Sequence, residues 1–295
     1  MSTHHNKISL ITINYNSTEY LKKLIKSSEK LQKYINEIIV IDNNSNLNNR
    51  NKLKRIEKNT LINTKLIRNK INLGFSKAVN QGIRVTKNNL ILLINPDCLI
   101  TNSDSIDEMI NCINKSKNNI VVGGRIYKNN KGKIQYSATQ GINFMTGIFE
   151  FTNVKKIWKN NPWSKNFWIE TNKITKPINV SSLCGAFVLF KKKNKNIKFQ
   201  FDENFFLYLE DVDFGLQISK LGYKVIFCPN SWIIHHGGRS NTSKYNIKLK
   251  YWYESRKYLF KKYLPKYQYI ILKLIFSIEE KLLSLYHFLK NEPAY

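Results

Sequence analysis

Apolar and polar positions in the first hundred residues alternate between two periods. Short runs rich in Ile, Leu and Val predict buried strands at residues 8–13, 37–42, 64–69 and 89–94. Residues 18–31 and 74–85, which lie between these runs, have helical spacing, and Ser17 is placed to cap the first helix. Strands that alternate with helices indicate an α/β fold with a mostly parallel, doubly wound sheet and flanking helices.

The pattern is less regular in the second half of the chain. Residues 126–180 are rich in Asn, Lys, Gly and aromatic side chains, and we interpret them as a variable insertion. After the insertion, the pattern predicts a buried strand at 181–190, a helix at 210–221 and a strand at 223–228. We therefore expect one domain over residues 1–243, followed by a basic, aromatic, helical tail over residues 244–295.

Charge changes this picture, because 48 Lys and Arg outnumber 20 Asp and Glu and give a formal net charge of +28. Such an excess favours a polyanionic partner, either nucleic acid or an acidic membrane surface. The basic residues are spread along the chain without a recognition motif, so we expect no nucleic-acid partner. The four cysteines lack metal-binding spacing and are typical of reduced thiols in the cytoplasm.

The tail allows two interpretations. Eleven Lys and Arg but only three Glu lie between Lys244 and Lys290, and the long apolar run at 269–289 is interrupted by charged residues. We therefore expect neither a spanning helix nor a signal peptide, because the N-terminus also lacks the required pattern. Amphipathic helices of this kind either pack on the domain or lie on the anionic cytoplasmic face of a membrane.

Polar residues follow the predicted strands at the edge where doubly wound sheets bind ligands. Asp42 is either a turn former or an acceptor for a ribose hydroxyl or a base N–H group. Asn95, Pro96 and Asp97 either form an ordinary turn or place a carboxylate where Mg²⁺ or Mn²⁺ could bind together with a diphosphate. His235 precedes two glycines, and its imidazole is either packed in the structure or a ligand of the same cation.

Five acidic residues crowd into the stretch 201–214, although acids are scarce in this chain: Asp202, Glu203, Glu210, Asp211 and Asp213. The last three begin the predicted helix, where negative charge is favourable, and this explains only part of the cluster. Aromatic neighbours raise the pKa of a carboxyl group and make it a better general base. Asp211 and Asp213 lie on different sides of a helix, so we expect Asp211 to face a site and Asp213 to face the structure.

Seven segments, taken in order, resemble the inverting family 2 glycosyltransferases of the GT-A fold, and especially their rhamnosyltransferase-like branch. They are "ITINYNS" (11–17), "IIVIDNNS" (38–45), "NLGFSKAVNQGI" (72–83), "LLINPD" (92–97), "CGAFVLFKK" (184–192), "FDENFFLYLEDVDFGLQISKLGYKV" (201–225) and "HHGGRS" (235–240). The resemblance covers about residues 8–242, with 126–180 poorly matched and expected near the acceptor.

The resemblance implies roles for residues on the donor side. It implies donor contacts for Thr12, Asn14, Asp42, Asn72, Gly74 and Asn95. Asp97 matches the last acid of the family's D-x-D metal motif, whose first acid is replaced here by Asn95. His235 matches a histidine that can join the Mg²⁺ or Mn²⁺ site.

For the acceptor side, the resemblance implies that Asp211, the second acid of an E-D pair, is the general base. Asp202, Glu203 and Glu210 would then lie beside the acceptor. The implied activity is metal-dependent transfer of a sugar, such as rhamnose, from a dTDP- or UDP-linked donor. The acceptor would be a hydroxyl group of a glycan or a lipid-linked molecule in the synthesis of cell-surface polysaccharide.

Three other classes of protein remain as alternatives. A nucleotidyltransferase would share the sheet and the metal aspartate, but the turn after its first strand is normally rich in glycine, unlike "NYNSTEY" here. A basic nucleic-acid-binding module would account for the charge. A catalytically inactive GT-A protein that only binds would keep the fold without a functional base.

Overall fold

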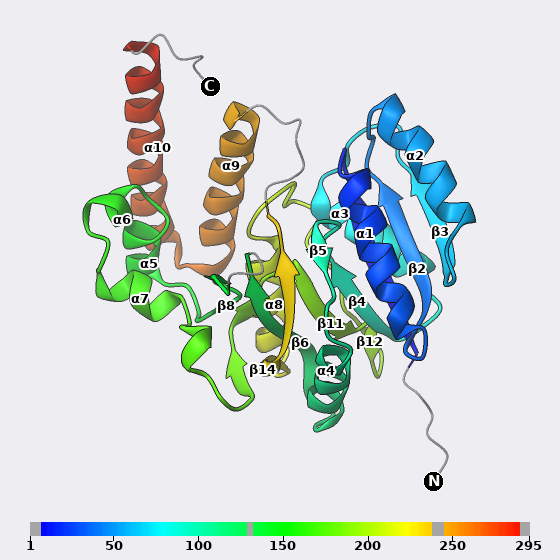
Figure 1. Ribbon diagram of the computed structural model, residues 1–295. Coiled ribbons are helices and arrows are strands. Elements are labelled where there is room, and N and C mark those ends of the chain that lie inside the picture. Colours follow the sequence, from blue (N-terminus) through cyan, green and yellow to red (C-terminus); the bar gives the residue numbers. More distant parts are fainter. Residues whose placement is uncertain (1–6, 129–131, 238–244, 290–295) are drawn as a thin grey trace.

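The computed structural model describes residues 7–128, 132–237 and 245–289, and its centre is a sheet covered by helices on both faces (Figure 1). The order of the main strands is β3-β2-β1-β4-β11-β6-β14-β5, with β7 beside β6 and β9 beside β14. Strands β1 to β4 are parallel, as predicted, whereas β11 runs antiparallel to both β4 and β6. The sheet is therefore mixed on one side of β4.

The elements of the first half have these bounds: β1 Ile8–Asn14, α1 Thr18–Ser28, η1 Glu29–Leu31, β2 Ile35–Asp42, α2 Leu47–Lys58, β3 Asn63–Arg68, α3 Phe75–Val85, β4 Leu90–Ile94, β5 Cys98–Leu99, α4 Asp104–Asn114 and β6 Asn119–Tyr127. Those of the second half are β7 Ile134–Gln135, β8 Ala138–Thr139, α5 Phe144–Phe149, α6 Val154–Ile157, α7 Pro162–Phe167, η2 Thr171–Lys173, β9 Ile178–Val180, β10 Ser182–Leu183, β11 Phe187–Lys191, β12 Lys193–Asn194, β13 Ile197–Lys198, α8 Glu210–Lys220, β14 Lys224–His235, α9 Tyr245–Tyr263 and α10 Lys266–Leu289. The strand predicted at 181–190 is thus two strands, β10 and β11.

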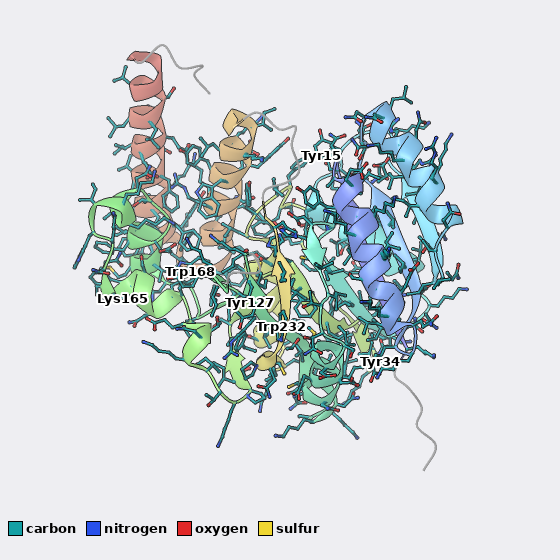
Figure 2. All side chains as sticks on the ribbon, viewed as in Figure 1. Tyr15, Tyr34, Tyr127, Lys165, Trp168 and Trp232 are labelled. Atoms are coloured by element: carbon teal, nitrogen blue, oxygen red, sulfur yellow. The ribbon has the colours of Figure 1, made fainter. Side chains whose placement is uncertain are left out.

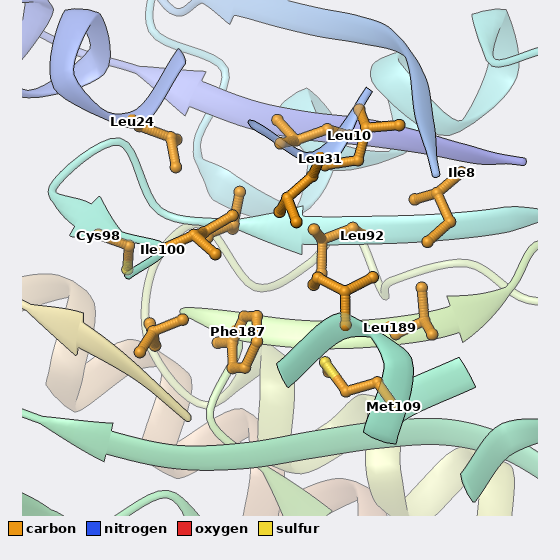
Figure 3. Packing of buried hydrophobic residues seen from close by; sticks show 14 of the residues in the cluster. Ile8, Leu10, Leu24, Leu31, Leu92, Cys98, Ile100, Met109, Phe187 and Leu189 are labelled. Atoms are coloured by element: carbon orange, nitrogen blue, oxygen red, sulfur yellow. The ribbon is translucent and has the colours of Figure 1, made fainter. Parts of the chain in front are cut away.

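Two apolar clusters fill the two faces of the sheet. On one face, α1 and α4 pack over alternate residues of β1, β4 and β11; Figure 3 labels Leu10, Leu92, Met109 and Leu189 within this cluster. On the other face, α3 and α8 cover the intervening residues of the same strands. Each buried leucine or isoleucine contributes about 1.5–3 kcal/mol to the stability of the fold. A slip of one residue would move these side chains to the other face of the sheet, so the alternation fixes the register of the strands.

A third cluster joins the insertion to the tail. Phe151 and Phe167 of the insertion pack against Leu259, Phe260 and other apolar residues of α9 and α10. Figure 1 shows α9 and α10 side by side, with α5, α6 and α7 against the base of α10. The tail therefore packs on the domain, which is one of the two interpretations that the sequence left open.

A buried arginine holds the helices of the tail together. Arg256 of α9, only 1% exposed, pairs with Glu279 at 2.5 Å and with Glu280 at 3.1 Å on α10, and also donates to the Phe151 carbonyl. The two glutamates that interrupt the apolar run of the tail are thus partners of one buried cation. Among the helices that the structure describes, none is long and apolar enough to cross a bilayer.

Candidate active site

Three predicted donor-side residues meet at the ends of β1 and β2. The Asn14 amide donates to Asp42 Oδ1 at 3.4 Å and to Ser45 Oγ at 3.0 Å, and Asp42 Oδ1 also accepts from the Ser45 backbone N–H at 3.2 Å. Thr12 Oγ1, Asn14 Oδ1 and Asp42 Oδ2 are buried and have no hydrogen-bond partner. Buried polar atoms normally have partners, so these oxygens are available to a polar ligand at this edge.

A network of asparagines forms the wall next to Asp42. Asn43 Nδ2 donates to Asn72 Oδ1 at 2.7 Å and to the Gly74 carbonyl at 3.1 Å, and Asn72 Oδ1 accepts the Gly74 N–H at 2.9 Å. Gly74 has φ +82°, and a Cβ there would lie 2.6 Å from the Phe206 carbonyl oxygen. Only glycine fits this position, which brings the start of α3 against the loop that leads to α8.

The pairing of the two-residue strand β5 with the end of β14 brings Asp97 and His235 together. Asn95 shapes the turn, because its N–H donates to the Ala186 carbonyl at 3.1 Å and its carbonyl accepts the Cys98 N–H at 3.1 Å. Strand β5 then pairs with β14, with Cys98 opposite His235. His235 Nε2 lies 3.1 Å from Asp97 Oδ1, and both side chains are buried. Of the matched segment 235–240, residues 238–240 lie outside the described part of the chain.

The Asp97–His235 pair fits a divalent cation. Two ligands at right angles around an octahedral cation, with bonds of about 2.1 Å, lie about 3 Å apart. The other ring nitrogen, His235 Nδ1, lies 3.0 Å from Gln135 Oε1, so a proton on Nδ1 would leave Nε2 able to coordinate a cation together with Asp97. The third possible ligand, Cys98 Sγ, donates to the Ala186 carbonyl, and burial raises the pKa of this thiol.

Asp211 is held at the start of α8 by two backbone donors. Its Oδ2 accepts the Gly185 N–H at 3.0 Å, and its Oδ1 accepts the Val212 N–H at 2.8 Å. Burial raises the pKa of Asp211, whereas these N–H groups favour its ionised form. Asp213 points the other way, as expected, and its Oδ1 accepts from Tyr263 Oη and Lys262 Nζ, each at 2.8 Å.

Glu210 differs from its neighbour, because its Oε2 is buried and has no hydrogen-bond partner. Burial, followed by the negative charge of Asp211, raises the pKa of Glu210 to about 8. Two adjacent carboxyl groups whose environments separate their protonation states are typical of acid and base pairs in active sites. Near pH 7, Glu210 therefore retains its proton, and the two backbone donors favour ionisation at Asp211 over ionisation at Glu210.

The backbone before this pair is strained. Tyr208 and Leu209 have φ values of +72° and +65°, in the left-handed region that bulky residues rarely adopt. Such residues cost about 1–3 kcal/mol each and persist only where their surroundings hold them. Here the tail holds them: Ser255 Oγ donates to the Leu207 carbonyl at 2.8 Å, and the Trp252 and Tyr208 rings are in edge contact.

The remaining acids of the cluster are neutralised by basic residues. Lys262 of α9 bridges Asp202 at 2.6 Å and Asp213 at 2.8 Å. Glu203 is exposed, lies 3.6 Å from Arg84 and accepts from Asn80 at 3.1 Å. Asp202 and Glu203, which the sequence placed at the acceptor, thus make contacts that stabilise the loop and the tail, and neither lines the cavity described next.

A cavity of about 260 Å³ opens beside Asp211. Side chains from the insertion, from β10, from the start of α8 and from α9 line it, and they include Tyr136, Ser137, Glu150, Lys155, Trp168, Glu210, Asp211 and Trp252. Trp168, labelled in Figure 2, follows α7 on the side of the insertion nearest the sheet. Tyr136 and Trp168 stack with their ring centroids 4.9 Å apart.

The segment 184–186 connects the two parts of the site. The Gly185 N–H holds Asp211, and the Ala186 carbonyl accepts from Asn95 and Cys98 beside Asp97. Cys184 lies so close to the site that burial and the charges of Asp211, Glu210 and Asp97 raise the pKa of its thiol to about 12. The predicted base and the predicted cation ligands therefore converge on one short backbone segment.

Several site residues were not predicted from the sequence. Asn43 and Ser45 lie in the quoted run "DNNS" next to Asp42, where that motif could have pointed to them. Gln135, Ser137 and Trp252 lie in the insertion and the tail, where no local pattern marks them. Only the pairing of distant segments brings these three side chains to the site.

Comparison with known proteins agrees with this geometry. Residues 9–197 match Glycosyl transferase family 2, so the chain belongs to this family. Its sequence is 25% identical over 189 residues to the N-acetylglucosaminyl-diphospho-decaprenol L-rhamnosyltransferase of Mycobacterium tuberculosis. This alignment covers 60% of the present chain and only 60% of the length of that relative.

Solved structures confirm the predicted GT-A fold. GalNAc-T7, crystallised with UDP, GalNAc and Mn²⁺, has a TM-score of 0.60 at 17% identity, over 79% of this chain and 44% of that one. The mannosyltransferase PcManGT of Pyrobaculum calidifontis, in complex with GDP-Man and Mn²⁺, has a TM-score of 0.57 at 13% identity, over 88% of this chain and 64% of that one.

Proposed function

We propose that the protein is an inverting glycosyltransferase that moves a sugar from a nucleoside diphosphate to a hydroxyl group of a glycan or lipid-linked acceptor. The position of the Asp211 carboxylate carries this proposal. Two backbone N–H groups fix this carboxylate at the edge of a cavity, and the segment 184–186 connects it to the Asp97–His235 pair. A positioned base beside a site for diphosphate is the arrangement that such a transfer requires.

The reaction follows from these positions. Asp211 removes the proton of the acceptor hydroxyl while the acceptor oxygen forms a bond to the anomeric carbon. The bond from that carbon to the phosphate oxygen breaks, and its electron pair leaves with the nucleoside diphosphate. Attack from the face opposite the leaving group inverts the anomeric centre in one step, through a transition state like that of inverting glycosidases.

The donor would bind along the ends of β1, β2 and β4. Thr12 and Asn14 offer buried oxygens without hydrogen-bond partners to the base and the ribose, beside the Asp42 carboxylate, whose Oδ2 lies 3.7 Å from Arg50 Nε. Asn72 and Gly74 form the adjacent wall. Asp97 and His235 would hold a Mg²⁺ or Mn²⁺ ion together with the diphosphate. When bound, such a cation neutralises the charge that develops on the leaving group.

The relative from Mycobacterium tuberculosis supports finer assignments. Its name combines rhamnosyl transfer with a lipid-linked sugar acceptor. We infer a dTDP- or UDP-linked donor, with rhamnose as the first sugar to test, and a role in the synthesis of cell-surface polysaccharide. The catalytically inactive alternative is less well supported, because a carboxyl group held by two backbone donors and a pair of possible cation ligands are both present.

The experiment is a donor screen on the purified full chain. Nucleoside diphosphate release from dTDP-rhamnose and a set of UDP-sugars is followed with acceptor glycosides in Mg²⁺, Mn²⁺ or EDTA. We expect release from one donor that requires a divalent cation and product of inverted configuration by NMR. Asp97→Asn should weaken the response to Mn²⁺. Absence of turnover and of donor binding across the panel would contradict the proposal.

We also propose that α10 contacts the anionic cytoplasmic face of a membrane. Seven large apolar side chains along one side of this helix are 48–65% exposed: Tyr267, Ile270, Ile271, Leu274, Ile278, Leu282 and Leu285. The exposed Lys266, Lys273 and Lys281 accompany them. An apolar stripe with lysines suits the boundary between acyl chains and anionic headgroups.

Liposome flotation tests this contact. We expect binding to vesicles that contain anionic lipid, and loss of binding in a Leu274→Glu, Ile278→Glu double variant. Leu221→Glu, which changes an exposed leucine at the end of α8, is the matched control and should still bind. A stripe buried between two copies of the chain would instead give a dimer in size-exclusion chromatography without lipid binding.

A further inference from the structure

Two cysteine side chains meet under α4, outside the cavity beside Asp211. Cys112 of α4 and Cys228 of β14 are 6% and 0% exposed, and their Sγ atoms lie 2.8 Å apart. Both are free thiols. A disulfide bond joins two sulfur atoms at about 2.05 Å, so this pair needs to close by only about 0.8 Å to form one.

The hydrogen bond between the two thiols makes them chemically different. With Cys228 as the donor, this bond stabilises a thiolate at Cys112 and lowers the pKa of Cys112; Lys115 acts in the same direction, whereas burial and Glu108 oppose it. The same bond, together with burial, raises the pKa of Cys228. Because the thiolate is the nucleophilic form of cysteine, Cys112 is the thiol that attacks an oxidant and Cys228 is the thiol that resolves the product.

The other two cysteines have different surroundings. Cys98 Sγ donates to the Ala186 carbonyl at 3.5 Å, and Cys184 Sγ accepts from Gln135 Nε2 at 3.9 Å. Burial raises the pKa of both thiols. Buried thiols of raised pKa react slowly, so Cys98 and Cys184 serve as internal controls for the reactivity of the pair.

The pair lies where β14 is irregular. The register between β14 and β6 shifts between Phe227 and Trp232, and Cys228 begins the unpaired stretch. At the far end of this stretch α4 already holds β14, because Ser105 Oγ donates to the Trp232 carbonyl at 2.9 Å and accepts the Trp232 N–H at 3.1 Å. A disulfide bond would fix the near end as well. It would join positions 116 apart in the sequence, which restricts the unfolded chain.

We propose that Cys112 and Cys228 form a redox modification site, at which a hydroperoxide produces a disulfide bond between α4 and β14. The Cys112 thiolate attacks one peroxide oxygen, the O–O bond breaks, and Cys112 becomes a sulfenic acid. The hydroxide that leaves takes up the proton that Cys112 had released. The Cys228 thiol then attacks the Cys112 sulfur, the S–S bond forms and the S–O bond breaks.

The balance of this reaction is complete. With hydrogen peroxide, two thiols and one peroxide give one disulfide and two water molecules, so the sulfur atoms are oxidised and the peroxide oxygens are reduced. A dithiol reductant reverses the reaction by thiol–disulfide exchange. The disulfide also protects Cys112 from irreversible oxidation to a sulfinic acid. This site does not depend on the proposed function, because it lies outside the candidate active site.

Peptide mapping of the unmodified full chain tests the proposal. The protein is treated with hydrogen peroxide, the remaining thiols are alkylated, and the digest is analysed by mass spectrometry. We expect one linked pair of peptides, joined through Cys112 and Cys228, with Cys98 and Cys184 alkylated, and four alkylated cysteines after treatment with dithiothreitol. Four free thiols after peroxide, a sulfinic acid at Cys112 without the linked pair, or preferential oxidation of Cys98 or Cys184 would overturn it.

Thermal unfolding gives a second readout. A disulfide that closes so long a loop should raise the melting temperature by about 5–10 °C, and dithiothreitol should reverse the shift. Cys112→Ser should show no shift with peroxide, whereas the matched control Cys184→Ser should keep both the shift and the linked peptides. An equal shift in Cys112→Ser would overturn the assignment. If this variant does not fold, Cys228→Ser replaces it, and the peptide map of the unmodified chain needs neither.

Discussion

The donor side and the acceptor side of this site are assembled in different ways. Except for His235, which joins Asp97 through the pairing of β5 with β14, the proposed donor-side residues lie between Thr12 and Asp97, near the ends of strands that follow one another in a repeated strand–helix unit. The proposed acceptor cavity takes side chains from the insertion, from β10, from the start of α8 and from α9, so it spans Gln135 to Trp252. The first side is built by local pattern, and the second exists only after distant segments have packed.

The same contrast appears in the electrostatics. On the donor side, asparagine amides and a single aspartate form a neutral or weakly charged network around Asp42 and Asn72. Of the five acids at residues 201–214, only Glu210 and Asp211 line the cavity, and Lys262 of the tail neutralises Asp202 and Asp213. The tail therefore neutralises part of the acidic cluster at residues 201–214, and Glu210 and Asp211 of this cluster line the cavity.

The largest effect is expected at the base. Asp211→Asn leaves an acceptor for only one of the two backbone N–H groups, because an amide nitrogen cannot accept a hydrogen bond, and it removes the proton acceptor, so kcat should fall by about 10²–10⁴-fold. The affinity for the nucleotide sugar should remain within about twofold, because donor contacts lie on the other side. Steady-state kinetics and calorimetric titration of the donor measure the two quantities. Unchanged transfer would show that another group removes the proton.

The next largest effect is on stability and concerns the tail. Arg256→Ala leaves Glu279 and Glu280 without their buried partner, which should lower the free energy of unfolding by about 3–5 kcal/mol. Lys250→Ala, which breaks an exposed pair with Glu254, should change it by less than about 0.5 kcal/mol. Urea unfolding compares the two variants. Similar free energies of unfolding for both would show that the buried arginine does not link the tail helices.

A smaller effect is expected where α8 touches β10. A Cβ at Gly215 would lie 2.3 Å from the Ser181 carbonyl oxygen, so Gly215→Ala should push α8 away and cost about 1–3 kcal/mol. The same shift would lengthen the hydrogen bond from Gly185 to Asp211 and lower kcat more than it alters donor affinity. Gly222→Ala at the end of α8 is not a suitable control, because its φ is +78°. Ser219→Ala, exposed on α8, serves instead.

The last effect is a change of slope with pH. The pKa of Glu210 is about 8 in the folded protein, above its ordinary value of 4.5, so the folded state holds a proton that the unfolded state has released. The free energy of unfolding should therefore fall as pH rises from about 4.5 to 8. Glu210→Gln removes this contribution and should flatten the fall, whereas Glu254→Gln should not. Urea unfolding at pH 5, 6.5 and 8 measures the slope.

The two sides also differ in how well the sequence predicted them. Strands β1 to β4 and helix α8 follow from local periodicity, because buried parallel strands and amphipathic helices leave clear patterns. The family and the GT-A fold were predicted and are confirmed. The antiparallel direction of β11 was not predicted, since a buried apolar run has the same pattern in either direction.

Long-range pairing limited the rest of the prediction. His235 reaches Asp97 only because the two-residue strand β5 pairs with the end of β14, and Lys262 reaches Asp202 only because α9 packs beside α8. Neither contact has a local signal in the sequence. Ser137 and Trp252 were missed for the same reason, since an isolated serine and a tryptophan in a basic helix have no pattern that marks a cavity.

The strained turn at Tyr208 and Leu209 has one more consequence. Two contacts from α9 help to hold their left-handed backbone, since Ser255 donates to the Leu207 carbonyl and Trp252 meets the ring of Tyr208. A chain cut before residue 245 would lose both contacts. We expect such a truncated protein to keep the strand ends proposed for the donor while the turn before α8 becomes less rigid.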